Sequence, residues 1–124
     1  MAVTFTSGEF TTGRTVKKIV GTWTCDSGGD ATGTTTSYYD GQVLAMQCIP
    51  LLTPTASVPT NLYDVVVTDS DGHDVALAAG ADSSNSGTEY KDESVLGAVS
   101  NSKLTFTVSN AGSLTGGVVV LWIR

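Results

Sequence analysis

The sequence contains little that would support catalysis, metal binding or a covalent cross-link. It has one histidine, two cysteines and three prolines among 124 residues. No Cys-x-x-Cys pair occurs, and a single histidine leaves too few ligands for a typical zinc site. None of the serines lies in the Gly-x-Ser-x-Gly turn of a hydrolase nucleophile. These shortages predict a protein that is not an enzyme and that holds no metal or other cofactor.

Basic residues are also scarce. Six Lys and Arg stand against twelve Asp and Glu, for a formal net charge of −6. Lys17 and Lys18 are adjacent and the others are scattered, so no basic stripe is available for a phosphate backbone. We therefore expect no direct nucleic-acid partner. The acidic balance favours solubility and a partner surface that is neutral or basic.

Long apolar runs and a leader sequence are absent from the pattern as well. No window reaches the roughly 18 apolar residues of a membrane-spanning helix, so we expect no membrane partner. The start, MAVTFTSGEF, lacks the basic and apolar parts of a signal peptide, which predicts synthesis in the cytoplasm. Cys25 and Cys48 are then expected to be reduced and buried. A disulfide between them stays open, since it requires only that their strands pair.

What the sequence does contain is typical of an all-β domain. Thr, Ser and Gly fill the space left by a hydrophobic content of 40%. Apolar and polar residues alternate, or run apolar throughout, in four stretches: Val16–Cys25, Gln42–Ile49, Leu104–Val108 and Gly116–Ile123. With about seven or eight strands at regular intervals, we predict a single-domain antiparallel β-sandwich or small barrel over residues 16–124. The weak alternation of residues 1–15 predicts an extended N-terminal arm or a short strand.

The segments between these strands differ in character. Residues 26–37 and 78–93 are small and polar, so we expect two long surface loops. Pro50–Pro59 carries all three prolines and predicts an extended crossover between sheets. Gly116–Ile123 is almost entirely apolar, which predicts an interior strand buried on both faces.

The clearest local signal lies in Asn61–Leu77, where two β-branched runs flank Asp69-Ser70-Asp71-Gly72. This pattern predicts a hairpin to which the other strands are added. Its acidic residues also suggest a calcium loop, but an EF-hand needs Gly at its sixth position and Glu at its twelfth. Here Gly72 is fourth and Gly80 is twelfth, so a turn explains the residues better. His73 is accordingly expected to be a solvated turn residue and not a general base.

Six aromatic residues could stack against a carbohydrate and are the remaining candidates for a site: Trp23, Tyr38, Tyr39, Tyr63, Tyr90 and Trp122. Trp23, Tyr63 and Trp122 are expected in the core or at an interface. Tyr38 and Tyr39 border a loop and are the best candidates for an exposed platform on which a carbohydrate stacks. A core or interface role is favoured over a carbohydrate platform.

The order of motifs from Val16 to Arg124 resembles a family of small structural proteins of tailed bacteriophages. A strand containing Trp23 is followed by a Gly/Thr loop and by the Tyr-x-Gly turn at Tyr39. The hairpin with the turn Asp69–Gly72 comes next. Two final strands, LTFTVSNAG from Leu104 and GGVVV after it, complete the pattern.

This resemblance implies a virion structural protein, most closely a capsid decoration (cement) protein that stabilises the major capsid protein lattice on the virion surface. Such proteins are β-rich and often trimeric, and they use extended segments that order on a partner. Phe5 and Phe10 in the arm are then the expected anchors, with Tyr38, Tyr39 and Trp122 as further capsid or oligomer contacts. The alternatives are a tail, collar or neck structural protein, or an Ig-like module that binds a glycan or receptor.

Overall fold

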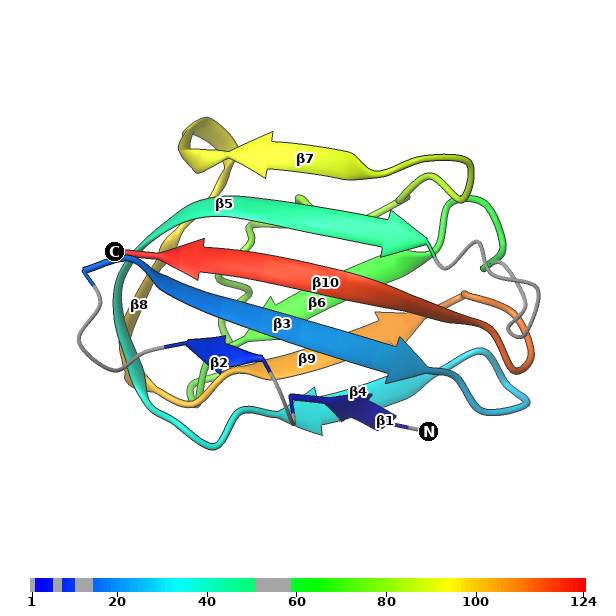
Figure 1. Cartoon of the computed structure of the whole chain (residues 1–124), viewed down its shortest axis with the longest axis horizontal. Coiled ribbons are helices and arrows are strands. Elements are labelled where there is room, and N and C mark those ends of the chain that lie inside the picture. The colour runs from blue at the N-terminus through cyan, green and yellow to red at the C-terminus, as the bar shows by residue number, and fades with distance from the viewer. Residues whose placement is uncertain (1, 6–7, 11–14, 51–58) are drawn as a thin grey trace.

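Two layers of β-strands face each other in the computed structural model, which describes residues 2–5, 8–10, 15–50 and 59–124 (Figure 1). The strands of four residues or more are β3 (Lys17–Thr24), β4 (Ala31–Thr34), β5 (Tyr39–Pro50), β6 (Asp64–Thr68), β7 (Glu89–Asp92), β8 (Ala98–Ser102), β9 (Thr105–Ser109) and β10 (Gly116–Ile123). Two shorter strands, β1 (Ala2–Thr4) and β2 (Glu9–Phe10), precede them, and a 3-10 turn, η1 (Glu93–Val95), follows β7. The predicted sandwich is confirmed, and the strands do not close into a barrel.

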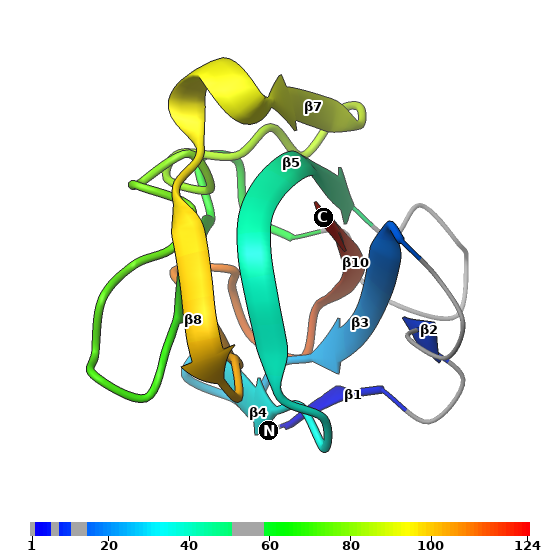
Figure 2. The same ribbon diagram turned by 90° about the vertical axis from the view of Figure 1, so that its left-hand side faces the viewer.

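The first layer consists of β3, β10, β5 and β7 in that order, and the second contains β4, β9 and β6 (Figure 1). The strands within each layer pair antiparallel. β1 joins the layers along one side, because it pairs antiparallel with β3 and parallel with β4. On the other side the first residues of β5 curve away to pair with β8 (Figure 2). Hydrogen-bonded backbone therefore links the two layers.

β10 lies in the interior of the first layer, as predicted, with β3 on one edge and β5 on the other. Its inward residues Val119, Leu121 and Ile123 are fully buried. The expectation that both faces are buried is only partly right. On the outward face Val120 is buried, whereas Val118 and Trp122 remain partly exposed.

The core lies between the layers and contains the aromatic residues that the sequence placed there. Trp23 and Tyr63 are buried with ring centroids 5.6 Å apart. Gly117 of β10 pairs with Trp23, and a Cβ at Gly117 would lie only 2.5 Å from indole Cζ2. Cys25 and Cys48 are unpaired and buried, and burial raises the pKa of Cys48 to about 11, which keeps this thiol protonated.

The hairpin expected in Asn61–Leu77 is only half present. The turn is confirmed, since Asp69 Oδ1 accepts hydrogen bonds from the backbone N of Asp71 (3.0 Å) and of His73 (2.9 Å). The prediction of a second strand after the turn is wrong. The chain makes one bridge, between Thr68 and Asp74, and then continues in turns. Asp74 causes this by accepting hydrogen bonds from two backbone N–H groups just ahead of it. β6 pairs with β9 instead and lies at one end of the strand order, so it does not organise the fold.

Two segments predicted as loops contain strands. β4 lies within residues 26–37 and is held by β9, with the Thr34 and Thr105 hydroxyls 2.9 Å apart across the pair. β7 lies within residues 78–93 and pairs with β5. Both segments are short in apolar residues, and their pairing with a neighbouring strand outweighs that deficit. In the predicted crossover Pro50–Pro59, Pro50 ends β5 and residues 51–58 lie outside the described residues.

We expect Tyr63→Phe to leave the free energy of unfolding unchanged or to raise it by up to about 1 kcal/mol. The Tyr63 hydroxyl is buried and has no hydrogen-bond partner among the described residues, so its removal recovers a desolvation cost. Tyr39→Phe is the matched control, because the Tyr39 hydroxyl donates to Glu9 at 2.8 Å and its loss should destabilise. Urea denaturation of the two variants measures both effects. A lower unfolding midpoint for Tyr63→Phe would contradict the expectation.

Candidate functional site

The anchors expected in the N-terminal arm are built into the edge of the sandwich. The Phe5 ring packs edge-on against Phe106, with centroids 5.2 Å apart and planes at 67°. It also borders Gly21, where a Cβ would lie 3.1 Å from Phe5 Cε1. Phe5 therefore packs on the protein's own core, while part of its side chain stays exposed. The backbone of Phe10 belongs to β2, and its side chain lies outside the described residues.

Tyr38 and Tyr39 do not form the exposed platform that their position suggested. Consecutive residues at the start of a strand point to opposite sides, so one ring faces solvent and the other faces the core. Tyr38 is 64% exposed with Lys103 Nζ 5.4 Å from its ring centroid, whereas Tyr39 is 1% exposed. The expectation that Tyr39 is exposed was wrong.

Glu9 fastens the arm to the chain just before β5 through an arrangement that we call the Glu9 clasp. Its carboxylate accepts hydrogen bonds from Thr36 N (3.0 Å), Thr36 Oγ1 (2.7 Å), Ser37 N (3.1 Å) and the Tyr39 hydroxyl (2.8 Å). Partial burial alone would raise the pKa of Glu9, but these four bonds together lower it below its usual value. The clasp positions β2 and does not present a reactive group.

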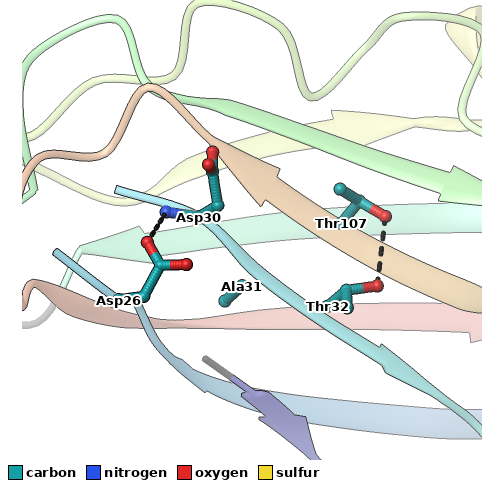
Figure 3. A pocket seen from close by; sticks show the side chains of 5 residues that line it. All are labelled: Asp26, Asp30, Ala31, Thr32 and Thr107. Carbon is teal, nitrogen blue, oxygen red and sulfur yellow. Dashed lines mark hydrogen bonds between the residues drawn. The ribbon is translucent and has the colours of Figure 1, made fainter. Parts of the chain in front are cut away.

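A shallow hollow of about 280 Å³ beside β4 holds two carboxylates, Asp26 and Asp30 (Figure 3). Asp26 Oδ1 accepts hydrogen bonds from Gly28 N (2.8 Å) and Asp30 N (3.1 Å). The bonds from Asp30 and Gly28 lower the pKa of Asp26. Thr32 and Thr107, whose hydroxyls are 3.5 Å apart, form the other side. The carboxylate of Asp26 thus shapes the turn between β3 and β4.

Two exposed leucines lie on adjacent turns at one end of the sandwich. Leu62 and Leu114 are 55% and 59% exposed, and both have left-handed backbone, with φ of 65° and 55°. Their turns are joined by hydrogen bonds from Thr60 N to Ala111 O (2.7 Å) and from Asn110 Nδ2 to Asp64 Oδ2 (2.7 Å). We call this surface, formed by residues 60–64 and 110–115, the leucine end.

The leucine end is acidic. Leu114 N donates to the carbonyl of Asp26 (3.1 Å), and Asp82 N donates to Asp64 Oδ1 (2.9 Å), so aspartates border both turns. The described basic residues lie elsewhere: Lys17 and Lys18 at the start of β3, Lys91 within β7, Lys103 between β8 and β9, and Arg124 after β10. A partner surface that fits here would present basic groups around an apolar socket.

At the opposite end of β10, a groove of about 380 Å³ opens on the outward face of the first layer. Trp122 of β10 and Tyr90 of β7 line it, with ring centroids 6.4 Å apart and planes at 54°. The other lining residues are Val16, Leu44, Ala45, Glu93 and Arg124. We call it the aromatic groove. Tyr90 was among the aromatic residues that could stack against a carbohydrate, but its place in an expected loop gave no reason to pair it with Trp122. The outward position of Trp122 follows from the alternation in β10.

The described residues hold no grouped set of metal-ligating side chains, meaning three or more of His, Cys, Asp or Glu. His73 is exposed in its turn. No helix in the described part of the chain is long and apolar enough to span a membrane. Comparisons with models of protein families, with curated proteins and with solved structures find no match.

Proposed function

We propose that this protein is a structural protein of a tailed-phage virion, and that it decorates the capsid as a homotrimer bound to the major capsid protein. The resemblance over Val16–Arg124 supports the virion role. The observation that carries the capsid role is the leucine end, where the backbone holds two apolar side chains in water. In this proposal the leucine end, and not Phe5, makes the capsid contact.

The leucine end is unfavourable in the free protein on two counts. A left-handed conformation costs an ordinary residue roughly 1–2 kcal/mol, and glycine or asparagine would avoid most of that cost. The exposed leucine side chains also gain nothing from burial while the protein is alone. Burial of each one in a partner would contribute about 1.5–3 kcal/mol, which a trimer on a repeating lattice multiplies. The surrounding aspartates favour a basic rim on the capsid protein.

The double substitution Leu62→Asn and Leu114→Asn tests this contact. We expect the variant to be as stable as the parent or more stable, by up to about 1 kcal/mol per site, because asparagine tolerates left-handed backbone. Its affinity for expanded, undecorated capsids should fall by about tenfold or more, since two apolar anchors are lost. Cosedimentation measures binding, and native mass measures the expected trimer.

Leu77→Asn is the matched control. Leu77 is also left-handed, with φ of 49°, and is 52% exposed, but it follows the bridge at Thr68, at the far end of β6 from the leucine end. This variant should gain the same stability and keep capsid binding. A parent protein that ignores capsids would contradict the decoration role, and saturable binding to purified tails or necks would then favour the alternative structural role. If the double variant binds capsids as tightly as the parent, the leucine end is not the capsid contact, but the decoration role still stands.

A further inference from the structure

We infer that the aromatic groove is a binding site for one ring of an uncharged saccharide. This site is separate from the proposed capsid contact, because the groove lies at the C-terminal end of β10 and the leucine end lies before its first residue. The inference therefore does not depend on the capsid role. It rests on the geometry of two aromatic rings, on the polar groups beside them and on the volume that they enclose.

The two rings offer the apolar surfaces that a sugar requires. Tyr90 is 61% exposed and Trp122 is partly exposed, and neither belongs to the core between the layers. Their planes meet at 54°, so the rings form two walls and do not stack on each other. The faces of a sugar ring carry C–H groups, which pack on an aromatic face and displace water from it. Val16 and Ala45 extend this apolar lining.

The polar groups beside the rings suit hydroxyls better than a charged ligand. Glu93 supplies a carboxylate that accepts hydrogen bonds, and Arg124 supplies a guanidinium that donates them. Lys18 Nζ also lies 6.0 Å from the Trp122 ring centroid, so groups of both charge signs border the groove. Acceptor and donor groups beside two aromatic rings are complementary to the hydroxyls and C–H faces of a neutral polyol.

The size of the groove agrees with this ligand. A volume of about 380 Å³ lies near the lower end of the range for small-molecule sites, which is roughly 300–1,000 Å³. It therefore accommodates one or two sugar rings and not a folded partner. The lining residues come from the middle of β5, from β7, from the end of β10 and from η1, with Val16 just before β3 and Arg124 just after β10. The two aromatic walls therefore stand on paired strands, which hold them at a fixed separation.

The test is a titration of the full chain with a broad panel of neutral oligosaccharides, built from glucose, galactose, mannose and N-acetylhexosamine units. Isothermal titration calorimetry measures binding, because its signal does not depend on Trp122, which one of the test variants removes. We expect at least one member of the panel to bind. Tyr90→Ala and Trp122→Ala should each weaken that binding by about tenfold, since each removes one stacking surface. Tyr38→Ala removes an equally exposed ring outside the groove and should leave binding unchanged.

Three results would overturn the inference: no binding by any member of the panel, binding that survives both groove variants, or binding only of sulfated or sialylated glycans. The Leu62→Asn and Leu114→Asn variant separates this inference from the capsid role. It should lose capsid binding and retain saccharide binding, whereas Trp122→Ala should do the reverse. Loss of saccharide binding in the leucine variant would also count against the groove as the site.

Discussion

Replacing Trp23 by alanine is expected to lower the free energy of unfolding by about 3–5 kcal/mol. The indole is 1% exposed and lies between the Tyr63 ring and the backbone of Gly117. Gly117 has no side chain that could fill the space left behind, and its strand is fixed by pairing on both edges. The cavity would therefore persist. Because small domains are stable by about 5–15 kcal/mol in total, the loss is a large part of the whole.

Trp122→Ala provides the matched control for this prediction. It removes the same side chain from the outward face of β10, where the indole is partly exposed and contributes to no core contact between the layers. Its cost should stay below about 1 kcal/mol, as for most surface substitutions. Urea denaturation followed by far-UV circular dichroism measures both variants without relying on tryptophan. Equal losses in the two variants would show that the assignment of inner and outer faces is wrong.

The second large effect is expected from Glu9→Ala, which should lower the free energy of unfolding by about 2 kcal/mol. The substitution removes the acceptor of four hydrogen bonds and leaves the hydroxyl of Tyr39 buried without its partner. Glu9 is only partly buried, so water can replace part of the lost bonding and the loss is smaller than four separate bonds would suggest. Equilibrium urea denaturation at neutral pH measures it.

The same clasp makes stability depend on pH in a defined direction. The folded pKa of Glu9 lies below its ordinary value of 4.5, so near that pH the unfolded chain binds more protons than the folded protein does. The contribution of the clasp is fully present above the unfolded pKa and is lost as the pH falls through the folded pKa. Glu9→Gln should therefore flatten the fall in stability between about pH 5 and pH 3. A slope remains from Asp64, whose pKa is lowered by hydrogen bonds from Asp82 and Asn110. An unchanged slope in Glu9→Gln would exclude the clasp as its source.

The sequence predicted the strands whose side chains alternate with respect to the core. Every second residue is buried in β3 and in β9. The same alternation is visible in the spacing of apolar residues along these two stretches of sequence. Strand β4, with the sequence ATGT, carries almost no such signal. It is a strand because β1 and β9 lie on its two edges, and those partners are distant in the sequence. Contacts of this kind cannot be read from local composition.

The candidate surfaces were harder to predict than the fold. Trp122 and Tyr90 were both candidates for stacking against a carbohydrate, but their proximity could not be predicted, because it depends on β5 pairing with both β10 and β7. A turn at Asn110-Ala111-Gly112 could be predicted from its Asn and Gly. The left-handed backbone at Leu62 and Leu114 could not, because leucine is disfavoured in that conformation. Phe5 was expected to be an anchor for a partner, because it is an isolated aromatic residue in an arm with few apolar residues. In the structure its ring packs against Phe106.

The central position of β10 has a consequence for how the chain folds. Its two partners, β3 and β5, both precede it by a long stretch of sequence, so neither pair can form by local zippering. Long loops must close before the layer gains its middle strand, and contacts of high sequence separation slow folding. Once in place, the backbone amides of β10 are shielded along both edges. Their hydrogens should exchange with solvent only when the whole domain opens, which makes this strand the slowest-exchanging unit of the protein.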